Sequence, residues 1–500
     1  MGLLRELAAL AHDAGAVLFL IGAATFLPLI LGCLWQEWDA LIPMATATVL
    51  LLGIGAVLRL LPKGEKPARG SLSIATTALI WVLVSFLGCF PFLFAGMNML
   101  DAAFESMSAW TGTGFTLAVN LEAWPKTLLF WRSFMQWIGG LGIIAFTLTV
   151  ASRSGLMARG LYRSEGRSEA FMPSVIATAF QMWKIYVVLT VVSIGAIMAT
   201  GLDLWDATNV ALCAIATGGM SIYTDGISHF QNAALEMVVV PIMLAGALPF
   251  RLYYLVYVNR SFQEILKDRV LHLMVAVFFF VSAVLTVDLL IQGVMPGEAL
   301  REALFMAGTA ISSAGFQNTT LVGWSAATML FLSVFLLIGG ASGSTAGGIK
   351  LDRIQVMFEA MVWWFRKTVV SPRAYIPLRH DGRAMAGKDA DMLIAKSLLL
   401  ILLYIVMVVA VVILFLHDPY FSRDVTATVY DVFSCVGNNG STAGMIGPDM
   451  PDYAKVIAYL AMWIGRLEII PVIILVWGIF RGFEFRLGSG PRKERREKDR

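Results

Sequence analysis

Four short stretches of this chain combine hydroxyl or amide side chains with glycine. They are DAAFESMSAWTGTGF (101–115), DATNVALCAIATGGM (206–220), EALFMAGTAISSAGF (302–316) and ATVYDVFSCVGNNGS (427–441). When they are aligned on Gly114, Gly219, Gly315 and Gly440, three of them carry an acidic residue thirteen positions earlier, Asp101, Asp206 or Glu302, and the fourth has Ala427 there. The repeated spacing indicates one structural unit that occurs four times.

The composition of each stretch predicts a short helix that ends at a cation site. An acidic residue at a helix start satisfies free N–H groups, so the negative C-terminal end of each helix should meet the glycine segment. Glycine lets a chain turn its carbonyl oxygens to one side, and a ring of carbonyls can replace the hydration shell of a monovalent cation. A single Thr-Gly or Ser-Gly pair is also ordinary in loops and helix contacts, but four copies in register favour a selectivity filter.

The candidate filter residues follow from this alignment and should bind the ion largely through backbone carbonyls. They are Thr111, Gly112, Thr113, Gly114, Thr217, Gly218, Gly219, Ser312, Ser313, Ala314, Gly315, Asn438, Asn439 and Gly440.

A second glycine-rich segment, GGASGSTAGGIK (339–350), interrupts an apolar segment that starts near residue 326. Such a segment cannot hold a helix in lipid, so we expect a break there. A movable gate and a static break are both open; a phosphate-binding loop is disfavoured because Ile-Lys-Leu follows the glycines. The candidate gate residues are Gly339, Gly340, Ala341, Ser342, Gly343, Ser344, Thr345, Ala346, Gly347, Gly348 and Arg466.

Arg466 lies inside an apolar run, where a charge is costly unless it faces water or a partner. We expect it to face the pore as a positive barrier; the alternative is a structural ion pair, for which Glu468 is poorly placed on a helix. Arg132 is expected to reach the membrane interface and to have no special role. Asp288 and Glu468 are the main acids expected within the spans.

The elements that must position these residues are membrane helices. The chain is 58% hydrophobic and 14% charged, with a mean hydropathy of +0.77, which excludes an ordinary soluble globule. Apolar segments of spanning length predict an all-α polytopic membrane protein with about ten transmembrane helices, four membrane-pore-membrane repeats with pseudo-fourfold symmetry around one pore, and two extra N-terminal helices. These segments are 14–34, 42–61, 72–95, 127–150, 185–200, 233–250, 271–292, 326–340, 391–416 and 456–480.

The predicted organisation divides the chain at its loops. It comprises two N-terminal transmembrane helices (1–70), the first repeat (71–160), the second (161–265), the third with the gate loop (266–385), the fourth (386–484) and a charged cytoplasmic tail (485–500). Most of the 37 Lys and Arg residues fall in the loops 62–70, 151–170, 251–269 and 350–390 and in the tail, which places both termini in the cytoplasm. The four cysteines and five histidines form no disulfide or metal pattern.

These motifs resemble the Trk/Ktr/HKT superfamily of potassium transporters, and most closely its Trk-type membrane subunit. The resemblance covers nearly the whole chain and is carried by ESMSAWTGTGFT, WIGGLG, ATGGMS, SSAGF, GGASGSTAGGIK, NNGSTAG and GRLEI. It implies potassium uptake across a bacterial or archaeal cytoplasmic (inner) membrane, with K⁺ as the transported ion and no other cofactor. It also implies a homodimer in which each protomer has its own pore, and a cytoplasmic nucleotide-binding regulatory ring as partner. Glycine at all four aligned positions implies potassium over sodium.

Other function classes are less favoured by the residues. A secondary symporter that couples potassium to sodium or protons would need several acids within the spans, and few are expected. A membrane enzyme would need a nucleophile with a base, or a metal cluster, and no such set is present. Membrane lipid is an expected partner, and nucleic acid is not.

Overall fold

The computed structural model describes residues 2–61, 70–143, 174–261, 263–370, 376–380, 383–385 and 387–481. The predicted loop at 151–170 and the tail from 485 lie outside this part. The α-helices are α1 (Gly2–Ala24), α2 (Phe26–Leu34), α3 (Trp38–Arg59), α4 (Gly70–Gly88), α5 (Phe90–Phe94), α6 (Met99–Thr111), α7 (Lys126–Leu141), α10 (Val175–Met198), α11 (Leu204–Ile215), α12 (Ala233–Gly246), α13 (Phe250–Asn259), α14 (Gln263–Leu266), α15 (Arg269–Ile291), α16 (Pro296–Ser312), α17 (Ala326–Leu337), α18 (Leu351–Val369), α19 (Gly387–Leu416), α20 (Pro419–Ser422), α21 (Val425–Val436), α22 (Asp452–Arg466) and α23 (Ile470–Arg481). The strands are β1 (Ile338–Gly339), β2 (Ile349–Lys350), β3 (Arg379–His380) and β4 (Arg383–Ala384).

The helices form four similar units around one axis. Each unit has a long outer helix (α4, α10, α15 or α19), a short helix (α6, α11, α16 or α21) and an inner helix (α7, α12, α17 or α22). Each inner helix packs against the short helix of its own unit and against that of the next: α7 lies on α6 and α11, α12 on α11 and α16, α17 on α16 and α21, and α22 on α21 and α6. The last of these contacts closes the ring, so the predicted arrangement of four repeats around one centre is confirmed.

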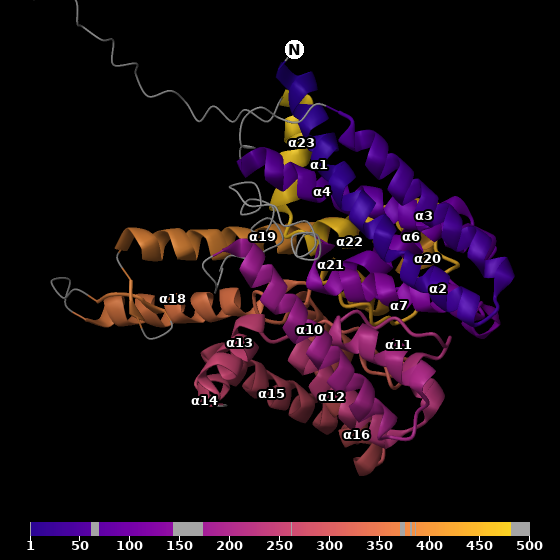
Figure 1. Cartoon of the computed structure of the whole chain (residues 1–500). Helices are drawn as coiled ribbons and strands as arrows, with labels where there is room; N and C mark the ends of the chain where they lie inside the picture. Colours follow the sequence, from indigo (N-terminus) through magenta and orange to yellow (C-terminus); the bar gives the residue numbers. More distant parts are fainter. Residues whose placement is uncertain are drawn as a thin grey trace, which may run out of the picture.

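The N-terminal helices α1 and α3 pack against each other and lie outside this ring, beside α4 (Figure 1). Their backbones approach closely at two glycines: a Cβ on Gly15 would lie 2.8 Å from the oxygen of Gly55, and a Cβ on Gly55 would lie 2.7 Å from the nitrogen of Phe19. These helices are the two extra N-terminal spans that the sequence predicts.

Six described helices or continuous helix pairs are long and apolar enough to cross a membrane. Two bent pairs, α12 with α13 and α22 with α23, raise this number to eight. Of the remaining predicted spans, 326–340 corresponds to α17, with 12 residues, and the described part of 127–150 corresponds to α7, with 16; residues 144–150 lie outside the described part. Within the described residues, apolar helices are therefore found at all ten predicted transmembrane segments, but they are not ten unbroken membrane helices.

Three inner helices break sharply within the described residues. The bend between α12 and α13 is 89°, and that between α22 and α23 is 110°. At the second bend Glu468 and Ile469 have φ angles of 59° and 69°, which no α-helix allows. Helix α17 instead ends in β1, which pairs in parallel with β2 and so closes the segment between them into a loop.

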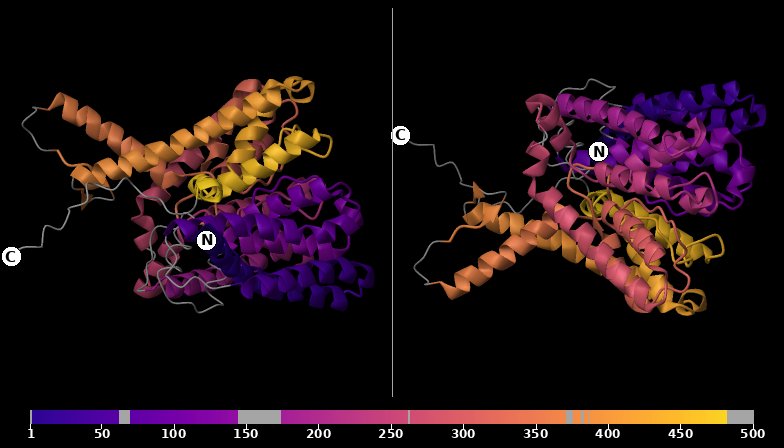
Figure 2. Two further views of the ribbon diagram at one scale, coloured as in Figure 1. Left: turned by 90° about the horizontal axis from the view of Figure 1, so that it is seen from above. Right: turned by 90° about the horizontal axis from the view of Figure 1, so that it is seen from below.

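Two elements extend away from the ring. Helix α18 and the beginning of α19 project together from one end of the molecule (Figures 1 and 2).

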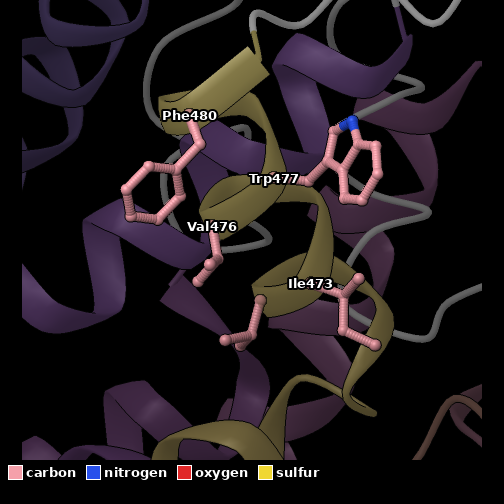
Figure 3. A pocket seen from close by; sticks show the side chains of 5 residues that line it. Ile473, Val476, Trp477 and Phe480 are labelled. Atoms are coloured by element: carbon pink, nitrogen blue, oxygen red, sulfur yellow. The ribbon is translucent and has the colours of Figure 1, made fainter.

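Helix α23 turns several apolar side chains outward, among them Ile473, Val476 and Phe480, which is 82% exposed (Figure 3). Such a face suits contact with hydrocarbon.

Candidate functional site

The four glycine-bearing loops have the same backbone course. Directly after the short helices, Gly112, Thr217, Ser313 and Asn438 all adopt left-handed φ angles between 52° and 65°. Two residues later, Gly114, Gly219, Gly315 and Gly440 have φ angles of 97°, 71°, 76° and 99°. Residues with a side chain rarely adopt the second conformation, so glycine is required by the backbone at all four positions.

These glycines also close a ring of contacts between the loops. A Cβ on each glycine would meet the carbonyl oxygen of the neighbouring loop: Gly114 meets Gly218 at 2.2 Å, Gly219 meets Ala314 at 2.1 Å, Gly315 meets Asn439 at 2.1 Å, and Gly440 meets Thr113 at 1.8 Å. The structure thus brings all four groups of candidate filter residues together, each loop against the next. A side chain at any ring glycine would clash with backbone.

The short helices point their C-terminal ends at this ring. Their starts are capped by Asn98, Asp203 and Asp424, which accept from the backbone N–H groups of the third residue on. Asp101 and Asp206 lie in the first turn, as predicted. The prediction for Glu302 is wrong, because α16 begins six residues earlier, at Pro296, and Glu302 lies in its second turn.

Buried charged groups lie behind the loops, and sequence reasoning missed most of them. Arg132 does not reach an interface: it is 1% exposed and forms an ion pair with Glu105 at 2.6 Å. In the fourth unit Asp431 is fully buried and accepts from Thr442 Oγ1 and from the N–H groups of Ala443, Met445 and Ile446, at 2.5–2.9 Å. Asp288 and Glu468 are therefore not the main acids within the spans.

The alignment of the four stretches could have identified two of these buried acids from their position. Glu105 and Asp431 both stand nine residues before a ring glycine, Gly114 or Gly440. The predicted pattern used only the position thirteen residues before it, where the fourth copy has alanine.

In the second unit a neutral side chain supports the loop. Gln136 of α7 donates to the oxygen of Gly218 at 2.7 Å and accepts from the N–H of Met220 at 3.1 Å. In the third unit Glu236 of α12 accepts from the Asn318 side chain at 2.7 Å and pairs with Arg301 at 2.6 Å. Every loop is thus held from behind by a carboxylate or an amide.

Outside the ring, the first two units also meet in their outer segments. Glu122 accepts from the backbone N–H and the hydroxyl of Thr224, both at 2.8 Å. The backbone hydrogen bond from Thr224 is the main cause that holds the pKa of the Glu122 carboxyl below its usual range.

The candidate gate segment Gly339–Gly348 lies between the inner helices, directly next to the ring. Thr345 Oγ1 donates to the oxygen of Gly246 at 2.9 Å and lies 3.1 Å from the oxygen of Ile215 and from Thr217 Oγ1. Its backbone N–H donates to Gly246 as well, at 3.1 Å. A Cβ on Gly347 would lie 2.6 Å from Asn438 Cβ. The segment therefore touches the second and fourth filter loops.

Arg466 binds this segment and the first inner helix at once. It donates to the oxygen of Thr345 at 2.9 Å and to the oxygens of Gly139 and Gly140 at 2.7 and 3.0 Å, and its guanidinium lies 5.6 Å from the centre of the Trp81 ring. Glu468 pairs with Arg353 and not with Arg466, for which the two-residue spacing predicted it to be a poor partner.

The far side of the gate segment borders a small cavity of about 30 Å³, roughly the room for one water molecule. Its lining includes Ser344, Lys350, Arg466 and Glu468. Lys350 donates to the oxygen of Ala346, and Asp352 accepts from the backbone and hydroxyl of Ser342 at 2.8 and 2.7 Å. Charged side chains that follow the segment thus hold it at Ser342 and at Ala346.

The described part of the chain contains no group of three or more His, Cys, Asp or Glu side chains that could hold a metal ion. All four cysteines are free thiols. The polar groups of the site are instead backbone carbonyls, hydroxyls and amides.

Comparison with known proteins agrees with this architecture. Residues 44–479 match the family described as "TrkH: Cation transport protein". An uncharacterised cation transporter of Methanocaldococcus jannaschii is 32% identical over 94% of this chain and 95% of its own length. The Trk system potassium uptake protein TrkH of Halomonas elongata is 29% identical over 92% of this chain and 96% of its own length.

A solved structure extends the likeness to three dimensions. The crystal structure of the potassium transporter TrkH from Vibrio parahaemolyticus superposes with a TM-score of 0.82 at 26% identity, over 95% of this chain and 99% of that chain. The chain belongs to the TrkH family of cation transport proteins and is a Trk-type membrane transporter, not an enzyme.

Proposed function

We propose that this protein takes up potassium through a selective, gated, channel-like pore. The observation that carries the proposal is the closed ring in which each loop glycine abuts a carbonyl oxygen of the next loop. Backbone oxygens held by rigid neighbours can replace the hydration shell of K⁺, and no side-chain carboxylate is needed. The names of two relatives, a potassium uptake protein and a potassium transporter, support the choice of ion.

The proposed filter comprises the residues around the ring glycines in all four loops. Gly114, Gly219 and Gly315 are partly accessible to solvent although the residues on both sides of each are buried. An ion at this level of the pore would therefore meet backbone atoms of the ring. The short helices point the negative ends of their dipoles at the same place and favour a cation there.

The segment Gly339–Gly348, together with Arg466, is proposed as the gate. Its contacts with Gly246, Thr217 and Gly139 are hydrogen bonds to backbone or hydroxyl groups, which can be exchanged for water when the segment moves. A guanidinium below the ring places a positive charge on the ion path. Opening would require Arg466 to leave the oxygen of Thr345.

Assembly and location are proposed from the family resemblance. The protein would lie in a bacterial or archaeal cytoplasmic membrane with both termini inside. It would form a homodimer, and a cytoplasmic nucleotide-binding ring would regulate it. The projecting helix α18 and the beginning of α19 offer a place where such a ring could act on the gate segment, since α18 follows it directly.

A symporter coupled to sodium or protons is the alternative, and the buried acids are the features that bear on it. Glu105, Glu236 and Asp431 each accept several hydrogen bonds within a single unit or between neighbours. They sit behind the loops as fixed supports and do not form a chain along the pore. This arrangement favours the passive pore.

The test is rubidium uptake by potassium-transport-deficient cells that express the chain. We expect Rb⁺ uptake that added K⁺ suppresses and that equal Na⁺ leaves nearly unchanged. Equal suppression by Na⁺ would contradict a potassium filter. A strict need for a sodium gradient would favour the symporter.

A further inference from the structure

Arg132 and Glu105 form a buried ion pair next to the filter loops. Arg132 lies on the inner helix α7 and Glu105 on the short helix α6, and their side chains are 1% and 0% exposed. The guanidinium approaches the same carboxylate oxygen twice, with Nη2 at 2.6 Å and Nε at 2.9 Å. Removing such a pair from water costs free energy, so its contribution to stability depends on the further hydrogen bonds that the two side chains make.

The pair holds two neighbouring loops at one level. Glu105 accepts from Thr116 Oγ1 at 3.0 Å and from the N–H of Leu117 at 2.9 Å, both in the first loop. Arg132 donates to the carbonyl oxygen of Ser221 in the second loop at 2.7 Å and to Thr116 Oγ1 at 3.2 Å. Thr116 and Ser221 each stand two residues after a ring glycine. The network therefore bridges the first and second loops at the outer edge of the ring.

The opposite junction is bridged at the same level by a neutral side chain. Gln317 and Thr442 also stand two residues after ring glycines. Gln317 donates to the oxygen of Thr442 at 3.0 Å and accepts from its N–H at 2.9 Å. Charge-assisted hydrogen bonds are shorter and about twice as strong as neutral ones, so the single bond from Arg132 to Ser221 is comparable in strength with the two bonds of Gln317.

We propose that Arg132 and Glu105 are positioning residues that set how well the pore discriminates K⁺ from Na⁺. The inference rests on the proposed function. They touch no ion; they fix the spacing between the first and second loops, and so keep the ring from closing around the smaller ion. Loss of the bridge lets the ring contract, and Na⁺ then competes better.

The test compares Rb⁺ and Na⁺ flux into liposomes that contain the purified full-length chain or a variant. Glu105→Gln and Arg132→Met should each lower the Rb⁺/Na⁺ ratio about tenfold, or about 1.4 kcal/mol of discrimination. The double variant should show little further loss, since both changes remove one bridge. Arg132→Lys should recover only part of the ratio, because one ammonium cannot reproduce the planar fork that binds both loops.

The matched control is Lys455→Met. Lys455 pairs with Asp101 at 2.6 Å, and the two side chains are 6% and 18% exposed, so it also joins two units by a largely buried ion pair, but at the start of α6, the end of that helix away from the filter loop. We expect it to lower thermal stability and to leave the ratio unchanged. Thr116→Val keeps the ion pair and removes the hydroxyl that links it to the first loop; this hydroxyl also accepts from the N–H of Ala118 at 3.1 Å. It should lower the ratio about threefold even if the charge variants fail to fold.

The outcomes separate the two proposals. A wild-type ratio near one would remove the potassium filter and with it this inference. A selective wild type whose bridge variants, including Thr116→Val, keep its ratio would overturn the inference alone and leave Arg132 a purely structural residue.

Discussion

At the scale of single residues, the ring glycines are fixed by two independent demands. Their backbone needs positive φ, and their missing side chain leaves room for the carbonyl of the next loop. Gly114 illustrates both, with a φ of 97° and a neighbouring oxygen 2.2 Å from the position of a Cβ. Any larger residue must displace the Gly218 carbonyl.

Gly114→Ser should therefore weaken potassium preference. The added side chain would push the second loop outward or turn its carbonyl, so the ring would bind K⁺ less well and the Rb⁺/Na⁺ flux ratio should fall about tenfold or more. The control is Gly297→Ser, where a Cβ meets nothing within 4 Å. An unchanged ratio in Gly114→Ser, at normal protein yield, would count against this register of the filter.

Asp431→Asn should loosen the fourth loop. The carboxylate of Asp431 accepts hydrogen bonds from three backbone N–H groups, and the amide would turn its own N–H₂ group toward at least one of them. That backbone N–H would lose its acceptor, and an unsatisfied buried donor lowers stability by about 1–3 kcal/mol. We expect a lower midpoint of thermal unfolding in detergent. Asp449→Asn, at an exposed position in the same outer segment, is the control and should unfold like the wild type. Equal midpoints for both variants would show that Asp431 contributes no support.

The roles of single residues could be predicted from the sequence where a pattern repeats. They could not be predicted where the partner of a residue lies far away in the chain. Gly114 and its three counterparts could be aligned without any structure. Arg132 could not be placed, because its partners Glu105 and Ser221 lie 27 and 89 residues away. A lone charge near a helix end has the same appearance in a sequence whether it reaches solvent or a buried carboxylate.

At the scale of elements, the inner helices are the parts that depart most from simple spans. Near the ends of α7, α12 and α22, Gly139, Gly246 and Gly465 lie against the ends of the short helices: a Cβ on each would lie 1.9–2.4 Å from the oxygen of Trp110, Ile215 or Val436. The break in the third unit is longest and contains the gate segment. Composition predicted this break, but it could not predict the sharp turns at Glu468 and Pro249, which depend on packing.

Arg466→Ala should raise basal flux in the absence of any partner protein. The change removes three hydrogen bonds that join the gate segment to α7 and removes a positive charge from the proposed ion path. We expect a rise of about tenfold in Rb⁺ flux into liposomes. Deletion within 341–347 should act in the same direction, whereas Arg466→Lys should remain close to the wild type because it keeps the charge. Equal or lower flux in Arg466→Ala and in the shortened loop would show that neither blocks the path.

At the scale of the whole molecule, four units of unlike sequence form one ring. The links between neighbours are all different: Arg132 with Ser221 between the first and second, Glu236 with Arg301 between the second and third, Gln317 with Thr442 between the third and fourth, and Lys455 with Asp101 between the fourth and first. The fourfold plan was predictable from periodicity. The links were not, because one partner of each, Arg132, Glu236, Gln317 or Lys455, has no residue of the same type at the equivalent position of the other repeats.

The proposed function requires that this one chain forms a passive, potassium-selective pore. The most direct measurement is ion flux into liposomes that contain only the purified protein, with K⁺, Rb⁺ and Na⁺ compared in the absence of any other gradient. We expect K⁺ and Rb⁺ flux well above Na⁺ flux without a coupling ion. Flux that appears only when a sodium or proton gradient is imposed would contradict it.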